Sequence, residues 1–305
     1  MSNAGQIQYV PHAHIDKSKW DRCIGQAANG LIYAYSVYLD AMSATWDALI
    51  LNDYETVMPL TWKKKFGIKY LYQPFITAQL GVFGNKLDAA TVQQFLDAIP
   101  APFRYIDISL NEGNTLNNIN GVIIRKNFLL HLGKSYGKIT SGYRENTVRN
   151  IKKSKQLNCY VKKEVEAEDV IKLAIRQMKT HQQEEKENIE RLRRLYNSLK
   201  TKNQTEVYGV FDRDELLASA IFFLDNKRAY YILVGNHPES RSTGASHALI
   251  DGFIQDHAEQ DLLLDFEGSD ISTLAFFYES FGATAHTYPS LRLNRLPFFL
   301  KWLKK

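Results

Sequence analysis

The spacing of hydrophobic residues changes between two periods along the chain, and this alternation predicts a mixed α/β fold. Short runs of apolar, aromatic and β-branched residues in the first half predict strands at residues 46–51, 56–62, 68–72, 105–109 and 122–132. Apolar positions three and four apart predict helices at residues 18–27, 36–44 and 87–98. The polar stretch 52–55 is a turn signal that joins the first two strands into a hairpin.

The second half of the chain repeats this order of elements. The same patterns predict helices at residues 146–156, 166–183, 187–199, 244–257 and 271–281. They predict strands at residues 159–163, 206–211, 216–224, 229–234, 261–266 and 292–296. A polar loop, residues 236–243, connects the third of these strands to the helix that follows it.

The length of the chain favours two domains. A single hydrophobic core rarely grows beyond about 250–300 residues, and this chain has 305. Because both halves share one order of elements, we expect two related α/β domains built on mixed sheets. The predicted boundaries place the first domain at residues 5–135 and the second at 136–290. The tail, residues 291–305, is a candidate to return to the first domain.

The composition is that of an ordinary globular protein. Apolar residues make up 45% of the chain and charged residues 23%, which excludes a disordered or collagen-like chain. No apolar run approaches the roughly 18 residues that a membrane span needs, and the first residues do not resemble a signal peptide. Cys23 and Cys159 lie too far apart in the sequence to indicate a disulfide framework or a metal site. We therefore expect a cytoplasmic protein without a bound metal.

The positive charge is concentrated in one segment near the predicted domain junction. The net charge is +5, and residues 138–163 hold eight basic residues and one acid. Such a segment is typical of a contact with a polyanion, which includes nucleic acid and an anionic membrane face. The alternative is a solvated helix face, and the sequence leaves both interpretations open.

Small and polar residues before the predicted helix 244–257 favour an anion site. Small side chains leave the first backbone N–H groups of the helix uncovered, and these groups together with the helix dipole suit a pyrophosphate. The candidate residues for this site are Arg241, Ser242, Thr243, Gly244, Ala245 and Ser246. The alternative is an ordinary helix start, in which Ser242 or Thr243 caps the helix.

A second group of polar residues follows a buried strand. Asp265, Glu267 and Ser269 stand at the end of the predicted strand 261–266, and ligands of α/β sheets bind at the carboxyl ends of strands. Tyr278 lies on the apolar helix that comes next. The alternative interpretations are a helix cap for the polar residues and a core position for Tyr278.

The order of these elements resembles the GNAT superfamily of acyl-CoA-dependent N-acyltransferases. The resemblance rests on the Arg241-x-x-Gly244 loop between strand and helix, and on the Phe-Tyr-x-x-Phe-Gly sequence at residues 277–282. The pyrophosphate loop of that family is Gln/Arg-x-x-Gly-x-Gly/Ala, and Ser246 replaces its last residue here.

The tandem arrangement is similar to the FemAB-like peptidyltransferases, which join two GNAT-like domains. The similarity includes Tyr143 with the sequence Arg-Asn-Ile-Lys-Lys-Ser at residues 149–154, and Asp-Phe-Glu-Gly-Ser at residues 265–269. These enzymes transfer amino acids from aminoacyl-tRNA to peptidoglycan-precursor peptides. The long helical arm of some members is absent, because residues 166–199 hold only two ordinary helices.

The resemblance implies an N-acyltransferase whose second domain is active and whose first domain is degenerate. The donor would be acyl-CoA, such as acetyl-CoA, or aminoacyl-tRNA, and the acceptor an amine such as that of a cell-wall precursor peptide. Tyr278 would protonate the leaving atom, and Asp265 or Glu267 would accept the amine proton. A backbone N–H of the third strand, near Val234, would stabilise the oxyanion. The implied substrate-binding residues are Tyr143, Arg149, Lys152, Lys153 and Ser269.

Three other functions stay open at this point. The chain could be a plain acetyltransferase for a small amine, or a non-catalytic GNAT-like module that binds a nucleotide or peptide. It could also bind nucleic acid, or lipid-linked phosphates, through residues 138–163.

Overall fold

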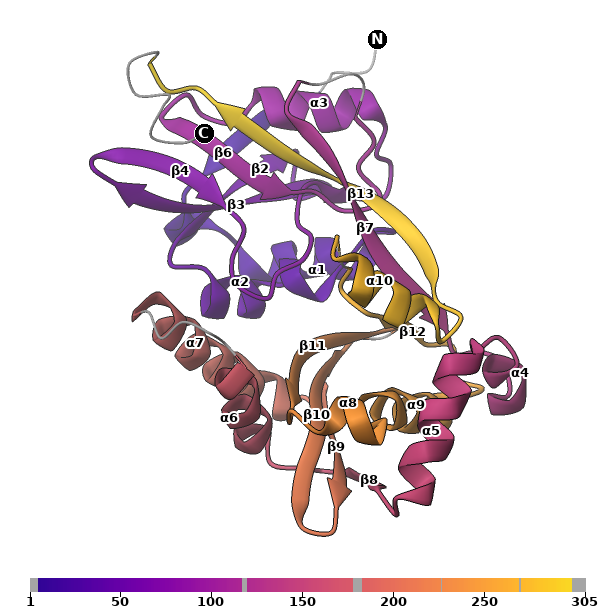
Figure 1. Cartoon of the computed structure of the whole chain (residues 1–305). Helices are drawn as coiled ribbons and strands as arrows, with labels where there is room; N and C mark the ends of the chain where they lie inside the picture. Colours follow the sequence, from indigo (N-terminus) through magenta and orange to yellow (C-terminus); the bar gives the residue numbers. More distant parts are fainter. Residues whose placement is uncertain (1–4, 117–119, 178–182, 226, 269, 298–305) are drawn as a thin grey trace. The chain divides into compact units, whose positions relative to one another are not determined.

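Figure 1 shows the computed structural model, which describes residues 5–116, 120–177, 183–225, 227–268 and 270–297. The chain divides into two compact units, one made of Met1–Arg125 with Thr287–Lys305 and the other of Lys126–His286. Two strands, β7 (Val122–His131) and β13 (Thr284–Asn294), carry the chain from one unit to the other.

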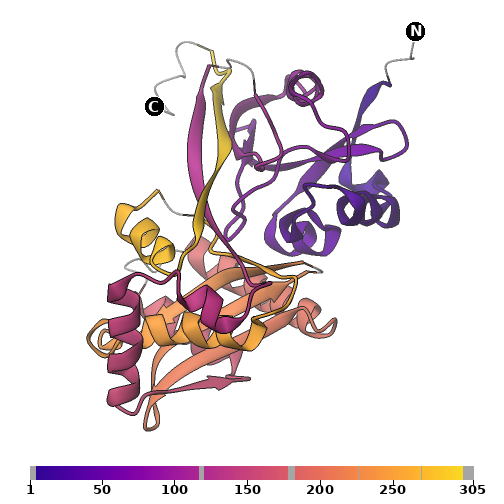
Figure 2. The same ribbon diagram turned by 90° about the vertical axis from the view of Figure 1, so that its right-hand side faces the viewer.

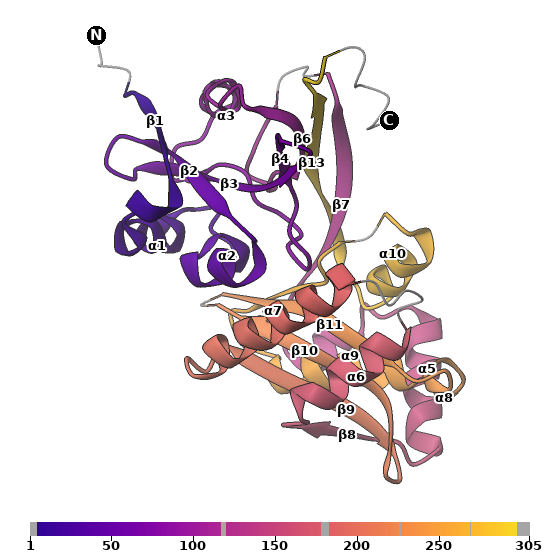
Figure 3. The same ribbon diagram turned by 90° about the vertical axis from the view of Figure 1, so that its left-hand side faces the viewer.

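The first unit contains a mixed sheet with helices on both faces. Its strands follow the order β1-β2-β3-β4-β6-β13, with β5 beside β3, and β4 and β6 are parallel whereas the other neighbours are antiparallel. Helices α1 and α2 cover one face, and α3 covers the other (Figure 3). The elements are β1 (Ile7–Val10), η1 (His12–His14), α1 (Lys17–Gln26), η2 (Ile32–Ala34), α2 (Ser36–Met42), β2 (Trp46–Leu51), β3 (Thr56–Lys65), β4 (Ile68–Tyr72), β5 (Phe83–Gly84), α3 (Ala89–Asp97) and β6 (Phe103–Ser109).

Alternating side chains of β2 form the two cores of this unit, because successive residues of a strand point to opposite faces. Trp46 contacts Trp20 of α1, with ring centroids 5.0 Å apart. Leu49 instead belongs to the buried cluster that contains Phe95 of α3. Aromatic side chains therefore pack against both faces of this sheet.

The second unit has the same kind of sheet, in the order β7-β12-β11-β10-β9-β8. Only β11 and β12 are parallel among the neighbours described. Helices α6 and α7 cover one face, and α9 covers the other with α5 beside it (Figures 2 and 3). The elements are α4 (Tyr136–Thr140), α5 (Glu145–Gln156), β8 (Tyr160–Lys163), α6 (Ala167–Gln177), α7 (Gln183–Lys200), β9 (Thr205–Asp212), β10 (Glu215–Leu224), β11 (Arg228–Asn236), α8 (Ser240–Thr243), α9 (Ala245–His257), β12 (Leu263–Asp265) and α10 (Ser272–Glu279).

The core of the second unit fixes α9 against the sheet. The rings of Phe222 on β10 and Phe253 on α9 are stacked, with centroids 3.9 Å apart. Both side chains are fully buried, and burial of an aromatic side chain stabilises a fold by roughly 2–3 kcal/mol. This packing holds the first turn of α9 beside the end of β11.

The predicted mixed α/β class is confirmed, but β1, β5 and α4 were not predicted, and the bounds of other elements differ. The predicted loop 236–243 contains the short helix α8, and the predicted strand 292–296 is part of the longer β13. Residues Ser290–Asn294 of β13 pair with β6 in the first unit, while residues 298–305 of the predicted tail lie outside the described part. The first residues of β13 are exposed, so they lack the alternating apolar pattern from which a strand is predicted. Pairing with neighbouring strands, rather than residue preference, determines that they are extended.

Candidate functional site

A cavity of about 950 Å³ lies in the second unit among β11 and the helices α5, α8, α9 and α10. Five of the residues singled out in the sequence line it, namely Arg149, Val234, Arg241, Ser246 and Tyr278. The other lining residues are Asn146, Asn150, Gln177, Tyr231, Asn236, Ser240, His247, Ser272, Thr273, Leu274, Phe276 and Phe277. The cavity therefore joins the start of α9 to the Tyr278 helix.

Strands β11 and β12 separate beside this cavity. Their parallel pairing ends at Tyr230 and Asp265, whereas β11 continues to Asn236. On its other side, β11 has an irregularity opposite Ile221 and Phe222, which leaves Ile232 as an extra residue. Past Tyr230, the edge of β11 that faces away from β10 carries backbone groups with no paired strand in the described residues. Tyr231 and Val234 of this segment line the cavity, so the unpaired edge of β11 lies beside it.

The start of α9 is built around Gly244. Gly244 has a φ of 74° and ends α8 as it begins α9, and a Cβ atom there would lie 2.3 Å from the backbone oxygen of Asn150. Only glycine fits both the left-handed conformation and this close approach to α5. No side chain caps the helix, so the first backbone N–H groups of α9 keep their capacity for a ligand.

The loop residues divide into two groups. Ser246 lines the cavity and donates to Asn236 Oδ1 at 2.8 Å, and the exposed Arg241 lines it as well. Ser242 and Thr243 donate their hydroxyl hydrogens to the backbone oxygen of Glu239, both at 2.9 Å. These two, with the buried Gly244 and Ala245, are not among the lining residues. The structure thus assigns a local structural role to their side chains.

Tyr278 lies at the inner wall of the cavity and is 8% exposed. Its ring is stacked on Phe266, with centroids 4.7 Å apart. Burial raises the pKa of the Tyr278 hydroxyl well above its ordinary value, and the charge of Glu267 raises this pKa further. The hydroxyl therefore keeps its proton at neutral pH and can donate it.

Asp265 and Glu267 have different surroundings. Asp265 is 1% exposed, lies 3.1 Å from Arg228 Nη1, and accepts a hydrogen bond from the Glu267 backbone at 2.8 Å. Glu267 is half-buried, with a φ of 61°, and its charge acts on Tyr278. Neither residue is among those that line the cavity. Asp265 is thus paired with the partly exposed Arg228, whereas the charge of Glu267 acts on the Tyr278 hydroxyl.

The predicted substrate-binding residues lie in three places. The Tyr143 hydroxyl donates to Asp251 Oδ1 at 3.1 Å, and the hydroxyl of Tyr136 in α4 donates to the same carboxylate. Tyr143 therefore links α9 to the segment between α4 and α5. Lys152 and Lys153 are exposed on α5, one turn beyond Arg149, which lines the cavity. Ser269 lies outside the described residues.

His247 was not singled out in the sequence, and it lines the same cavity. Its ring makes edge contact with Phe277, with centroids 4.8 Å apart, and its Nε2 lies 3.5 Å from Asn150 Nδ2. Burial lowers the pKa of His247 to about 4. The only signal in the sequence was its place in the first turn of the helix after Gly244.

We expect His247 to make the folded state sensitive to acid. A histidine with a lowered pKa is neutral in the folded chain, so the unfolded chain binds more protons between pH about 6.5 and about 4. Stability therefore falls as the pH falls through this range, by about 1–2 kcal/mol after solvent screening. Urea unfolding at a series of pH values checks this: the loss should be smaller in His247→Gln. Equal pH dependence in both proteins would contradict it.

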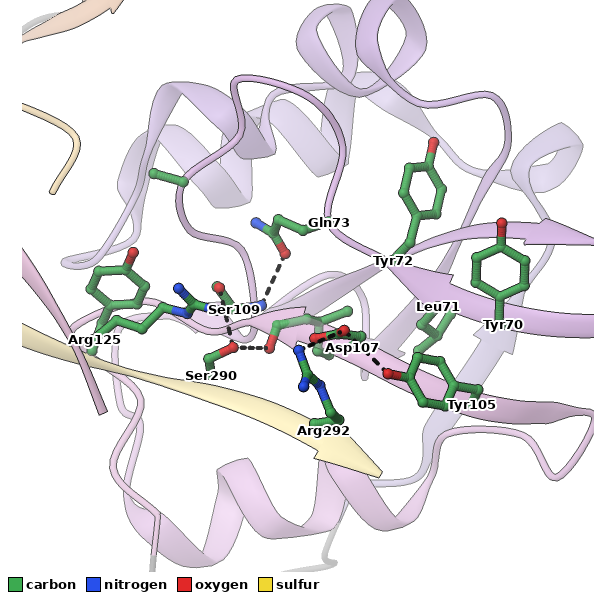
Figure 4. A pocket seen from close by; sticks show the side chains of 13 residues that line it. Tyr70, Leu71, Tyr72, Gln73, Tyr105, Asp107, Ser109, Arg125, Ser290 and Arg292 are labelled. Atoms are coloured by element: carbon green, nitrogen blue, oxygen red, sulfur yellow. Dashed lines mark hydrogen bonds and ion pairs between the residues drawn. The ribbon is translucent and has the colours of Figure 1, made fainter. Parts of the chain in front are cut away.

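A second cavity, of about 450 Å³, lies in the first unit (Figure 4). Its polar groups largely bind one another. Arg292 pairs with Asp107 at 3.2 Å, and the Ser109 hydroxyl donates to Ser290 at 3.4 Å. Gln73 accepts the backbone N–H of Ser109 at 2.9 Å. These contacts join β4, β6 and β13, so they stabilise the sheet of the first unit.

Comparison with known proteins identifies the fold. Residues 141–270 match the family model described as an acetyltransferase (GNAT) domain. Among the curated proteins, no significant match was found. Within the described residues, no helix is long and apolar enough to cross a membrane, and no group of three or more His, Cys, Asp or Glu residues could hold a metal.

Three solved structures are similar over 85% or more of this chain. FemX shares 12% identity and a TM-score of 0.65, over 97% of this chain and 99% of that one. A tandem GNAT protein from the clavulanic acid pathway shares 9% identity and a TM-score of 0.52, over 96% and 99%. The L-PGS structure from Bacillus licheniformis shares 10% identity and a TM-score of 0.52, over 85% and 87%.

Proposed function

We propose, from the GNAT domain in the second unit of this tandem GNAT, FemAB-like fold, that the protein is an N-acyltransferase. The observation that carries the proposal is the cavity that connects the uncapped start of α9, the separated edge of β11 and Tyr278. Transfer from a phosphate-bearing acyl donor needs a binding site for the donor phosphates, a hydrogen-bond donor to the oxyanion, and a general acid near the leaving atom. The start of α9, the edge of β11 and Tyr278 are the candidates for these three roles.

The donor is held by its phosphates at the start of α9. The backbone N–H groups after Gly244 and the guanidinium of Arg241 supply positive electrostatic potential there. Arg149 adds a second cation from the α5 wall. The remaining cavity, past Val234 to Tyr278, receives the arm that carries the acyl group.

The reaction then proceeds by direct transfer. The amine attacks the acyl carbonyl, and the tetrahedral oxyanion accepts a hydrogen bond from a backbone N–H of β11 past Tyr230. The C–S or C–O bond to the leaving group breaks, and Tyr278 donates its proton to the leaving atom. Glu267 is the candidate acceptor of the amine proton, directly or through a water molecule, because its charge already acts on Tyr278.

Two donors fit these features, and binding experiments separate them. Acyl-CoA that raises the Tm of the protein, with the rise lost when Arg241 is replaced, supports a CoA donor. Lys152 and Lys153 beside Arg149 favour aminoacyl-tRNA, whose binding would weaken steeply with salt. Binding of neither donor would contradict the proposed transferase and support a non-catalytic module. The acceptor is an amine, and the FemX-like fold is the reason to include a cell-wall precursor peptide in the first screen.

Replacing Arg241 by Ala is expected to raise the KM for acyl-CoA about tenfold and leave kcat nearly unchanged. The guanidinium would contact the phosphates equally in the ground state and the transition state, and about 1.4 kcal/mol corresponds to tenfold. Initial rates at a range of donor concentrations test this, and Lys202→Ala is the matched control, since Lys202 is exposed and lies away from the cavity lining. An unchanged KM would remove Arg241 from the donor site.

A further inference from the structure

The hairpin of β3 and β4 lies in the first unit (Figure 1), and it ends in an exposed aromatic residue among lysines. Lys65 and Ile68 are paired directly, so Phe66 and Gly67 form a two-residue turn. Phe66 is 87% exposed. Residues 62–72 contain four lysines and no acidic residue. We call Lys63, Lys64, Lys65, Phe66 and Lys69 the hairpin tip.

Two features of the hairpin tip are unfavourable for the hairpin itself. Phe66 and Gly67 have φ values of 50° and 79°, as in a type I′ turn, where Asn, Asp or Gly is strongly favoured at the first position. Lys64 lies directly opposite Lys69, and like charges in this arrangement destabilise a strand pair. Residues that are unfavourable for the local structure, such as these, are expected at functional positions.

Aromatic rings support the lysines of the hairpin tip. The Lys69 ammonium lies 4.3 Å from the centroid of the Trp62 ring, and the Lys63 ammonium lies 4.7 Å from that of Tyr72. Such contacts order the aliphatic stems while the charged ends stay at the surface. The result is an apolar apex surrounded by positive charge.

We propose that the hairpin tip docks the first unit on an anionic phospholipid surface. Phe66 enters the headgroup region, and Lys64, Lys65 and Lys69 approach the lipid phosphates. Each lysine close to an anionic bilayer strengthens binding about fivefold, and a buried aromatic side chain adds the second signal that a stable peripheral contact needs. Trp and Tyr side chains, present here as Trp62 and Tyr70, are enriched at membrane interfaces.

A bilayer fits these observations better than a single-stranded nucleic acid does. Nucleic acid is held in basic grooves in which successive bases stack on aromatic rings. Here the rings of Trp62 and Tyr72 already contact lysine ammonium groups, and Phe66, with the Lys65 ammonium 5.6 Å from its ring centroid, lies at an exposed two-residue turn rather than in a groove. A flat and deformable surface accommodates such an apex.

Co-sedimentation of the full chain with vesicles tests the proposal. We expect binding to vesicles that contain phosphatidylglycerol with phosphatidylcholine, and at least tenfold weaker binding to phosphatidylcholine alone. Phe66→Asn should weaken vesicle binding about tenfold without lowering the Tm, because Asn suits the first position of a type I′ turn. The triple variant Lys64→Gln, Lys65→Gln, Lys69→Gln should lose binding, and the charge-matched control Lys86→Gln, Lys134→Gln, Lys202→Gln should keep it, since these lysines are exposed elsewhere.

A second measurement keeps the test independent of the first. The emission of Phe66→Trp, after subtraction of the parent spectrum, should shift to shorter wavelength on addition of anionic vesicles. Equal binding to both vesicle types, unchanged binding of Phe66→Asn, or no spectral shift would overturn the proposal. Loss of tRNA binding in the triple lysine variant, with vesicle binding unchanged, would also overturn it and assign the lysines to nucleic acid.

Discussion

Replacing Tyr278 by Phe is expected to lower kcat about 10²–10³-fold with little change in the KM for the donor. A positioned general acid contributes about 10²–10⁴-fold to a proton transfer. A tyrosine hydroxyl carries its proton at neutral pH even at its ordinary pKa, and burial raises the pKa of Tyr278 further, so the proton is present. Phe preserves the ring that is stacked on Phe266, and the fold should therefore be unaffected.

The leaving group provides a sharp readout for this role. A thioester whose thiol has a low pKa leaves as the thiolate without a proton, so the defect of Tyr278→Phe should shrink with such a donor. A purely structural effect would not depend on the leaving group. Tyr231→Phe is the matched control, because Tyr231 is also buried and lines the same cavity. A larger defect in Tyr231→Phe than in Tyr278→Phe would transfer the acid role to Tyr231.

The sequence allowed prediction of the elements and of their order because the hydrophobic periods are strong in both halves. Gly244 and Tyr278 could be singled out for the same reason: each has a fixed place relative to a well-predicted helix. Their meeting around one cavity could not be derived from spacing alone. It depends on how far β11 and β12 stay paired, and this is decided by packing across the sheet.

Other residues of the site could not be assigned because their roles depend on distant partners. Tyr143 precedes a basic helix in the sequence, which favoured a substrate contact, yet its hydroxyl meets Asp251 from a helix far along the chain. His247 gave no signal because burial, which lowers its pKa, is a property of the folded unit. The sequence predicted strands at residues 56–62 and 68–72, but the two-residue turn and the pairing of Lys64 with Lys69 needed the strand register.

Asp265→Asn is expected to lower the stability of the chain by about 3–5 kcal/mol. Asp265 is 1% exposed and lies 3.1 Å from Arg228, whose side chain is 15% exposed. Replacing the buried carboxylate breaks its ion pair with Arg228, and loss of one partner of such a pair is strongly destabilising. The Tm should fall by roughly 10 °C, since about 1 kcal/mol corresponds to a fall of about 2–4 °C for a unit of this size. Thermal unfolding followed by circular dichroism measures the shift.

Three further variants separate this structural role from catalysis. Asp214→Asn, at an exposed acid on the turn after β9, should leave the Tm unchanged. The double variant Asp265→Leu with Arg228→Met should recover part of the stability, because it removes both charges of the buried pair. Glu267→Gln should lower kcat without the fall in Tm if Glu267 accepts the amine proton. A stable Asp265→Asn protein with abolished turnover would contradict this assignment and make Asp265 the base. The arrangement around Arg228 argues against that outcome, because the Asp265 carboxylate is already paired with the Arg228 guanidinium.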